Sequence, residues 1–270
     1  MKIQYASDLH LEFKDNSHFM MESGLEVVGD ILLLVGDIIY LENQGMEGHP
    51  FFDWCSKNYR ETIIIPGNHE YYRDPYAKGN MRPYKNLVET LDAYEHKLRD
   101  NVRYLNNKSM VIDNVEIFGT TLWTITDPRF YVGIQTGMND CRQIVYGDHN
   151  LWADDYTLVH GICRDWLDDA LKKSKAQHKV VLTHHCPISR KEFDIYNVGS
   201  RLWSAFHVDM EGFMREHDIE YWVYGHTHVQ SGSGTQFESM KNGTTVLCNQ
   251  LGYVQCCEHK EFNHQAFFEL

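Results

Sequence analysis

Residues 219–228 read IEYWVYGHTH, an aromatic and β-branched run followed at once by two histidines, His226 and His228. The run at 219–224 is typical of a strand that is covered on both faces. The residues after it place two imidazoles, which are common metal ligands, at the carboxyl end of that strand. The same arrangement recurs along the chain, and this recurrence predicts the fold.

Six further runs rich in β-branched and apolar residues predict strands at 2–7, 31–35, 62–66, 115–123, 179–183 and 244–248. Strands that alternate with helical patterns indicate an α/β chain. The helical patterns are clearest in two sets of apolar residues, each expected on one helix face: Leu87, Leu91, Tyr94 and Leu98, and Leu158, Ile162, Trp166 and Ala170.

No repeat, low-complexity segment or Pro/Ser-rich linker divides the chain, so we predict a single domain over residues 1–270. The least patterned region is 124–153, which is rich in glycine and has few apolar runs. We expect it to be a long loop or insertion beside the site.

Metal-binding residue types follow five of the predicted strands. In open α/β sheets, ligands gather outside the carboxyl ends of the strands, so side chains far apart in sequence converge there. Each motif alone is more typical of a turn, a cap or a surface histidine. Their coincidence at five strand ends predicts metal binding by a set drawn from Asp8, His10, Asp37, Asn68, His69, His184, His185, His226 and His228.

Two choices arise within this set. The tetrapeptide VGDI occurs twice, but Asp30 precedes the strand at 31–35 whereas Asp37 follows it, so Asp37 is the expected ligand and Asp30 a turn residue. Side chains alternate along a strand, so only one of His184 and His185 faces the site easily. The pattern alone leaves that choice open.

Composition limits the function classes. The formal net charge of −13 repels nucleic acid backbones and anionic membranes. The seven cysteines form no CxxC pair, which favours reduced thiols in a cytoplasmic protein over a disulfide framework. We read no signal or transit peptide in MKIQYASDLHLE, and no run of 18 apolar residues predicts a membrane span.

The motifs SDLHLE, VGDI, PGNHE, THHCP and GHTH, in this order between residues 7 and 228, resemble the calcineurin-like metallophosphoesterase family. The resemblance implies a four-layer α/β/β/α sandwich with mixed sheets and a binuclear metal centre that hydrolyses phosphate esters by attack of a metal-bridging hydroxide. It selects His184 over His185. The implied ligands are Asp8, His10, Asp37 and His228 for one metal, and Asp37, Asn68, His184 and His226 for the other.

The residue types suit phosphate chemistry. Two divalent ions carry four positive charges, of which Asp8, Asp37 and a bridging hydroxide remove three, so a positive surplus faces the substrate. Neutral Asn68 and the imidazoles preserve that surplus. Imidazole ligands also favour Mn, Fe, Zn or Ni over Mg or Ca, so we expect two divalent transition-metal ions.

His69 resembles the acid residue of the family, which protonates the leaving alkoxide or donates to a phosphoryl oxygen. The alternative is a histidine that only supports the ligands. The chain departs from the protein Ser/Thr phosphatases of the family, because GDIIYLE lacks the aspartate and arginine that they carry soon after GD. Protein phosphatase activity is therefore disfavoured, and the sequence does not identify a partner that would orient His69.

Substrate contacts are expected from GMNDCRQI, residues 137–144, where Asn139, Asp140 and Arg142 could reach the cleft. Arg142 suits a phosphate through its planar fork, although an ordinary surface salt bridge explains it equally well. Tyr71, Tyr72 and Trp123 lie near strand ends, where core packing is favoured over stacking on a base.

The predicted partner is a small phosphodiester or phosphomonoester, nucleotides included. A nuclease is the alternative enzyme, disfavoured by the charge of −13 and the lack of a basic stripe. A non-catalytic binding or scaffold protein is the alternative from another class, disfavoured because every ligand position is filled. The sequence gives no sign of the oligomeric state.

Overall fold

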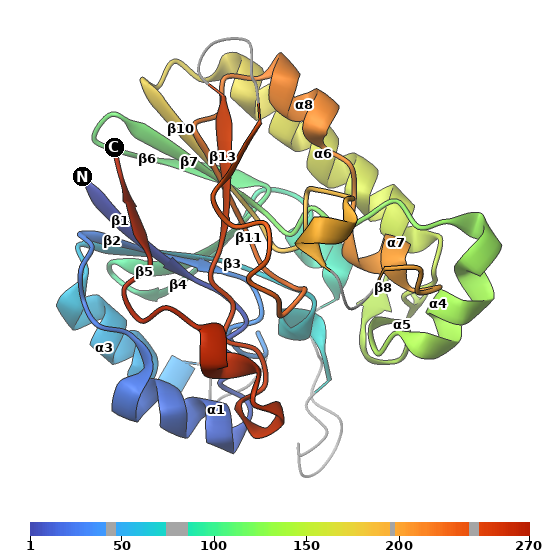
Figure 1. The fold of residues 1–270 in the computed structure, drawn as a ribbon, viewed down its shortest axis with the longest axis horizontal. Helices are drawn as coiled ribbons and strands as arrows, with labels where there is room; N and C mark the ends of the chain where they lie inside the picture. The colour runs from blue at the N-terminus through green and yellow to red at the C-terminus, as the bar shows by residue number, and fades with distance from the viewer. Residues whose placement is uncertain (42–46, 74–85, 195–197, 238–242) are drawn as a thin grey trace.

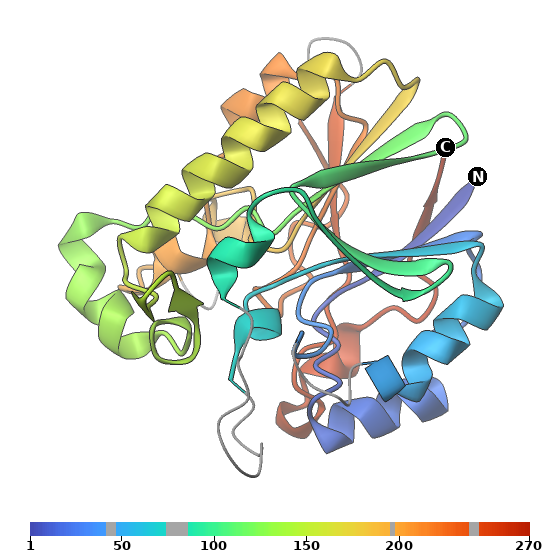
Figure 2. The same ribbon diagram turned by 180° about the vertical axis from the view of Figure 1, so that it is seen from behind.

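The computed structural model describes residues 1–41, 47–73, 86–194, 198–237 and 243–270. Two six-stranded sheets pack face to face, and helices cover the outer face of each (Figures 1 and 2). This is the predicted four-layer α/β/β/α sandwich with mixed sheets.

The first sheet has the order β14-β1-β2-β3-β5-β4. Its four central strands are parallel to their neighbours, and the edge strands β14 and β4 are antiparallel. Its strands are β1 Lys2–Ala6, β2 Ile31–Val35, β3 Glu61–Ile65, β4 Tyr94–Arg99, β5 Val102–Asn106 and β14 Phe267–Glu269.

The second sheet has the order β12-β13-β11-β10-β7-β6, again with parallel central strands and antiparallel edges. The carboxyl ends of the parallel strands therefore point the same way within each sheet. Its strands are β6 Lys108–Ile112, β7 Val115–Thr120, β10 His178–Thr183, β11 Tyr221–Tyr224, β12 Thr235–Phe237 and β13 Thr244–Cys248.

Helices α1 and α3 lie against the first sheet, and α6 and α8 lie against the second (Figure 1). The α-helices are α1 Lys14–Phe19, α3 Pro50–Asn58, α4 Tyr131–Gly137, α5 Asp140–Gln143, α6 Asp155–Lys173, α7 Trp203–Phe206 and α8 Glu211–Glu216. A short π-helix, η1, spans Met20–Gly24. The short 3₁₀ helices are η2 His69–Tyr71, η3 Leu87–Thr90, η4 Pro128–Phe130, η5 Lys191–Phe193, η6 Val254–Cys256 and η7 Glu258–Glu261.

The core explains why the central strands read as unbroken apolar runs. Along β2, Leu33 packs between the two sheets, whereas its neighbours Leu32 and Leu34 pack on the outer side with α3. Each strand must therefore be apolar on both faces. Burial of one such aliphatic side chain stabilises the fold by roughly 1.5–3 kcal/mol, so these runs determine which strands lie at the centre.

The predicted helix through Leu87 and Leu98 is wrong. Leu87–Thr90 is a short 3₁₀ turn, and Tyr94–Arg99 is the edge strand β4, paired antiparallel with β5. Leu87, Leu91 and Leu98 do share one buried cluster, but they reach it from a turn and a strand. Pairing with a distant strand outweighs the local helical spacing here.

The second predicted helix is confirmed as α6, but its buried face is different. Leu158 is 59% exposed and Ile162 is 42% exposed, whereas Val159, Cys163 and Leu167 are fully buried. Trp166 and Ala170, from the predicted face, are only partly buried against the second sheet's core. Apolar residues on adjacent faces of one helix leave the sequence pattern ambiguous about which face docks.

Region 124–153, which we expect to be a long loop or insertion beside the site, contains η4, α4, α5 and a small hairpin of β8 Val145–Tyr146 and β9 His149–Asn150. Ile134, Met138 and Ile144 anchor this segment in the main core. The seven cysteines carry free thiols, as predicted. Among the described residues, no helix combines the length and apolar character needed to cross a bilayer.

Candidate metal centre

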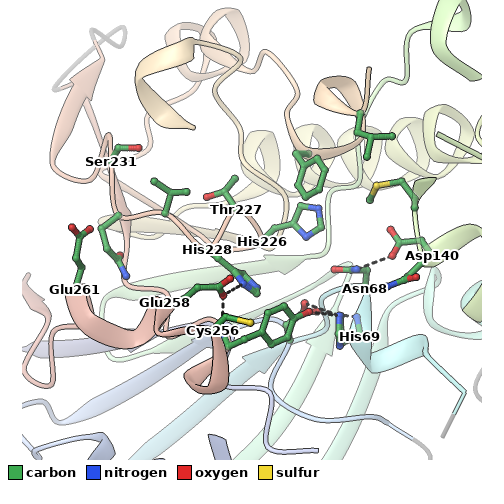
Figure 3. A pocket seen from close by; sticks show the side chains of 18 of the residues that line it. Asn68, His69, Asp140, His226, Thr227, His228, Ser231, Cys256, Glu258 and Glu261 are labelled. Atoms are coloured by element: carbon green, nitrogen blue, oxygen red, sulfur yellow. Dashed lines mark hydrogen bonds and ion pairs between the residues drawn. The ribbon is translucent and has the colours of Figure 1, made fainter. Parts of the chain in front are cut away.

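The ends of β1, β2, β3, β10 and β11 meet at a cavity of about 1080 Å³ (Figure 3). All seven predicted ligands lie here. Six of them, Asp8, His10, Asp37, Asn68, His184 and His226, are buried, and His228 is partly buried. Asp37, Asn68, His226 and His228 line the cavity.

One ligand group consists of Asp8, His10, Asp37 and His228, whose donor atoms all lie within 4.8 Å of one another. His10 Nε2 lies 3.1 Å from His228 Nε2 and 3.8 Å from Asp37 Oδ2. His228 Nε2 lies 3.5 Å from Asp8 Oδ1. This group coincides with the set that the resemblance implies for one metal.

A second group consists of Asp37, His184 and His226, again within 4.8 Å. Asn68 joins it, because its Oδ1 lies 3.1 Å from His184 Nε2, which is itself 3.3 Å from Asp37 Oδ1. His226 Nε2 is buried and has no hydrogen-bond partner. Asp37 therefore belongs to both groups, one carboxylate oxygen facing each.

The hydrogen bonds on the far side of each imidazole test whether a cation fits. His10 Nδ1 faces Glu12, His228 Nδ1 faces Glu258, and His184 Nδ1 faces the Val35 carbonyl. Because each of these partners only accepts, each Nδ1 carries the proton and leaves its Nε2 as a lone pair when the ring is neutral. When both rings are neutral, the lone pairs of His10 and His228 face each other at 3.1 Å and repel, an arrangement that requires a proton or a metal ion between them.

The electrostatics agree with this requirement. Burial acts to lower the pKa of His184 and His228, but nearby carboxylates outweigh it. Asp37 is the main cause that raises the pKa of His184 to about 9, and Asp8 and Glu258 raise that of His228 to about 10. The site thus attracts cations, and its mixed imidazole, carboxylate and amide donors suit divalent transition metals.

Two glycines that directly precede ligands, Gly36 and Gly67, leave room for a ligand from another strand. A Cβ at Gly67 would lie 2.2 Å from Asp37 Oδ1, and one at Gly36 would lie 2.2 Å from His184 Nδ1. These two steric requirements explain the GN and GD motifs. Five ligand residues have left-handed backbone, which is uncommon outside glycine and gathers at functional sites: Asp8 (φ 57°), His10 (47°), Asp37 (55°), His226 (76°) and His228 (54°).

His69 lies at the edge of the two groups and lines the cavity. Its Nδ1 is 2.9 Å from Glu12 Oε1, and its Nε2 is 3.3 Å from the Tyr253 hydroxyl and 4.0 Å from Asp37 Oδ2. Burial acts to lower the pKa of His69, but Asp37 and Glu12 outweigh it and raise this pKa above its ordinary value. The ring is therefore suited to carry a proton toward the cavity.

Three carboxylates that the sequence interpretation did not single out support the ligands. Glu12 contacts His10 and His69, and Glu258 contacts His228. Glu70 accepts from the backbone N–H of Asp37 at 2.9 Å, Ile38 at 2.8 Å and Gly67 at 2.7 Å, and so ties two ligand loops together. Burial, with the nearby Asp37 carboxylate, raises the pKa of Glu70 to about 7.

The predicted substrate contacts separate in the structure. Asn139 is exposed and lines the cavity. Asp140 also lies at the cavity wall, but it is buried, and its oxygens accept from Asn68 Nδ2 (2.8 Å) and from the hydroxyls of Tyr72 and Tyr156. It therefore fixes the Asn68 amide with Oδ1 toward His184. Figure 3 shows this contact.

Arg142 is exposed, and it is not among the described residues that line the cavity. Its guanidinium donates to the Thr136 carbonyl at 2.6 Å and to Asn139 Oδ1 at 2.5 Å. These contacts direct the guanidinium at residues of its own segment and not at the metal centre.

Of the remaining residues that the sequence analysis considers, one lines the cavity, Tyr72. His185 is buried, with Nδ1 3.2 Å from the Thr121 carbonyl and its ring 4.3 Å from that of His226. Tyr71 and Trp123 are fully buried, as core packing predicts, whereas Tyr72 reaches the cavity. Asp30 is exposed at the opposite end of β2, where it accepts from the backbone of Lys2.

The cavity has one apolar wall and one polar wall. Met138, Leu202 and Phe206 form the apolar wall, and residues from 227–231 and 253–261 form the polar wall. Among the described lining residues, Lys260 is the one lysine or arginine, and it is accompanied by Glu258 and Glu261.

Comparison with known proteins identifies a family whose model matches most of the chain. The family model described as "Calcineurin-like phosphoesterase" matches residues 1–230. An uncharacterized protein of Acanthamoeba polyphaga mimivirus is 28% identical over 288 residues, covering 99% of this chain and 96% of that protein. The crystal structure of a phosphopantetheinyl hydrolase from Mycobacterium tuberculosis superposes with a TM-score of 0.66 at 13% identity, covering 100% of this chain and 95% of that one, which shows the shared fold.

Proposed function

The chain belongs to the calcineurin-like phosphoesterase family, a family of metal-dependent phosphoric ester hydrolases, and we propose that it hydrolyses a small phosphodiester or phosphomonoester. The observation that carries the proposal is the convergence of donor atoms from four other strand ends around the carboxylate of Asp37, which follows β2. The proposed ligands are Asp8, His10, Asp37 and His228 for one ion, and Asp37, Asn68, His184 and His226 for the other.

A bound pair of divalent ions supplies a nucleophilic water at neutral pH and neutralises charge on the phosphoryl oxygens. The donor set favours Mn, Fe, Zn or Ni for both positions. The chain holds the pair with few negative charges, because Asp8 and Asp37 are the only carboxylates among the seven proposed ligands. Asn68 contributes a neutral oxygen, which Asp140 keeps turned toward His184.

His69 is the proposed acid. Its Nδ1–H donates to Glu12, so a second proton, on Nε2, is directed at the cavity. When the ester P–O bond breaks, its electron pair stays on the leaving oxygen, and that oxygen takes the Nε2 proton of His69, while water forms the new P–O bond and loses a proton to solvent. Neutral His69 then regains a proton from solvent.

The cavity supports a small substrate over nucleic acid. The apolar wall of Met138, Leu202 and Phe206 can receive an uncharged ester group beside the phosphate. A nucleic acid strand needs a basic track along its backbone, and the described lining offers Lys260 against Glu258 and Glu261.

The metal content is the first expected result. Elemental analysis after reconstitution with Mn should approach two ions per chain, because the seven proposed ligands form two groups that share one carboxylate. Chelation should remove the activity together with the ions. A content that stays near zero under saturating metal would contradict the proposal.

The reaction class is tested with three substrates in the presence of Mn: a bis-aryl phosphate, an aryl monophosphate and single-stranded DNA. We expect hydrolysis of at least one aryl ester and no cleavage of the DNA. Cleavage confined to DNA would favour the nuclease, and turnover of none of the three, with two ions bound, would favour a binding protein. The ratio of diester to monoester rates then gives the preferred substrate class.

A further inference from the structure

One carboxylate oxygen of Glu12 contacts two imidazoles with different proposed tasks. Glu12 Oε1 lies 3.1 Å from Nδ1 of His10, a proposed metal ligand, and 2.9 Å from Nδ1 of His69, the proposed acid. The two rings meet edge to face, with centroids 4.4 Å apart. The Glu12 side chain is 3% exposed, so solvent does not compete for this oxygen.

The backbone fixes Glu12 in this position. His10 N–H donates to the Asp37 carbonyl at 2.9 Å, and Leu11 N–H donates to the Ile38 carbonyl at 2.8 Å. The loop after β1 is therefore hydrogen-bonded along the loop after β2. The next residue, Glu12, is thereby placed beside His69. The segment after Asp37 supplies no such carboxylate at 38–41, where the side chains are apolar or, at Tyr40, phenolic.

Both Nδ1 atoms contact the same acceptor, Glu12 Oε1, and this fixes the direction in which each Nε2 atom points. His10 Nε2 is left to face Asp37 and His228, and His69 Nε2 is left to face the cavity beside the Tyr253 hydroxyl. A ring flip or a change of tautomer in either histidine would break its bond to Glu12. One side chain thus controls the direction of both rings.

We propose that Glu12 is a positioning residue that orients His10 toward the metal and His69 toward the leaving group through the same carboxylate oxygen. This inference rests on the proposed function, because it assigns the partner of the acid in the same reaction. It predicts that one substitution at Glu12 disturbs metal binding and leaving-group protonation together.

The chain offers a matched control in Glu258. Its Oε2 lies 2.7 Å from Nδ1 of His228, a ligand of the same proposed ion, but no contact joins Glu258 to His69 among the described residues. Glu258→Gln should therefore weaken metal binding alone. His69→Asn should affect leaving-group protonation alone, because His69 is not a proposed ligand.

The experiment measures Mn affinity by direct titration and, at saturating Mn, the rate ratio between an activated aryl ester and an alkyl ester. Glu12→Gln keeps the side-chain volume. It should weaken Mn binding by roughly 10–100-fold and raise the aryl-to-alkyl ratio at least about tenfold, because an alkoxide needs a proton and a nitrophenolate does not. Glu258→Gln should weaken Mn binding and keep the wild-type ratio.

Thermal unfolding with saturating Mn checks that each variant folds. If Glu12→Gln does not fold, Glu12→Asp serves instead, because a carboxylate shortened by one methylene cannot reach both rings and should shift both readouts in the same direction. A Glu12 variant that weakens Mn binding but keeps the wild-type ratio, or that changes neither readout, overturns the proposal. Failure of the wild-type chain to hydrolyse either ester would overturn the proposed function instead, and the two failures are distinct.

Discussion

Asp37→Asn is expected to lower kcat/KM at least about a hundredfold on any phosphate ester that the chain hydrolyses. The carboxylate is the one side chain common to both proposed ligand groups, with Oδ1 3.3 Å from His184 Nε2 and Oδ2 3.8 Å from His10 Nε2. An amide removes one negative charge and turns an NH₂ donor toward one of the two groups. Steady-state kinetics, with metal content measured on the same sample, check the result.

Asp30→Asn is the control, because it makes the same chemical change within the same tetrapeptide, VGDI. Asp30 is exposed at the amino end of β2, and its carboxylate accepts from the backbone N–H of Lys2. We expect near wild-type kinetics and two bound ions. Equal losses of kcat/KM in the two variants would contradict the assignment of Asp37 as a ligand from its position at the carboxyl end of β2.

The layers of the fold were predictable where strands are covered on both faces. The run at 31–35 is apolar at every position because Leu33 packs between the sheets and Leu32 and Leu34 pack outward. The antiparallel strand β4 gave no such signal. Its residues Tyr94 and Leu98 continue the three- and four-residue spacing of Leu87 and Leu91, which is typical of one face of a helix, so the segment is interpreted as helical from the sequence.

The proposed ligands were predictable because each of their motifs is local. A glycine and a polar residue directly after an apolar strand already indicate that another side chain packs against the turn, as Asp37 does at Gly67. Glu12 and Glu70 lie inside the quoted motifs SDLHLE and PGNHE, yet nothing in either motif states which imidazole or amide the carboxylate meets. That pairing depends on how two loops dock.

Other parts of the site have no local signal at all. Glu258 lies in the 3₁₀ turn η7, and Tyr253 directly precedes the 3₁₀ turn η6. Both follow β13, far from the motifs that carry the resemblance, and tertiary packing alone brings them to His228 and His69. Arg142 illustrates the reverse case. Its sequence context is suitable for phosphate binding, but in the folded chain its guanidinium is directed at Thr136 and Asn139.

His69→Asn is expected to lower kcat on an alkyl phosphate ester by roughly 10²–10⁴-fold, the usual contribution of a positioned general acid. The bound metal should stay near two ions per chain, because the imidazole contacts Glu12 and Tyr253 and belongs to neither proposed ligand set. The loss on an activated aryl ester should be smaller, since a nitrophenolate departs without a proton. Kinetics on both esters, with elemental analysis of the same protein, measure all three quantities.

Tyr253→Phe is the matched control for this variant. It removes the hydroxyl 3.3 Å from His69 Nε2 but leaves the imidazole and its bond to Glu12, so the aryl-to-alkyl ratio should stay close to that of the wild type. If His69→Asn slowed both esters equally, His69 would stabilise the phosphoryl oxygens rather than protonate the leaving group. If the variant lost metal, the ring would support the ligands only, and the proton would have to reach the leaving oxygen from another group.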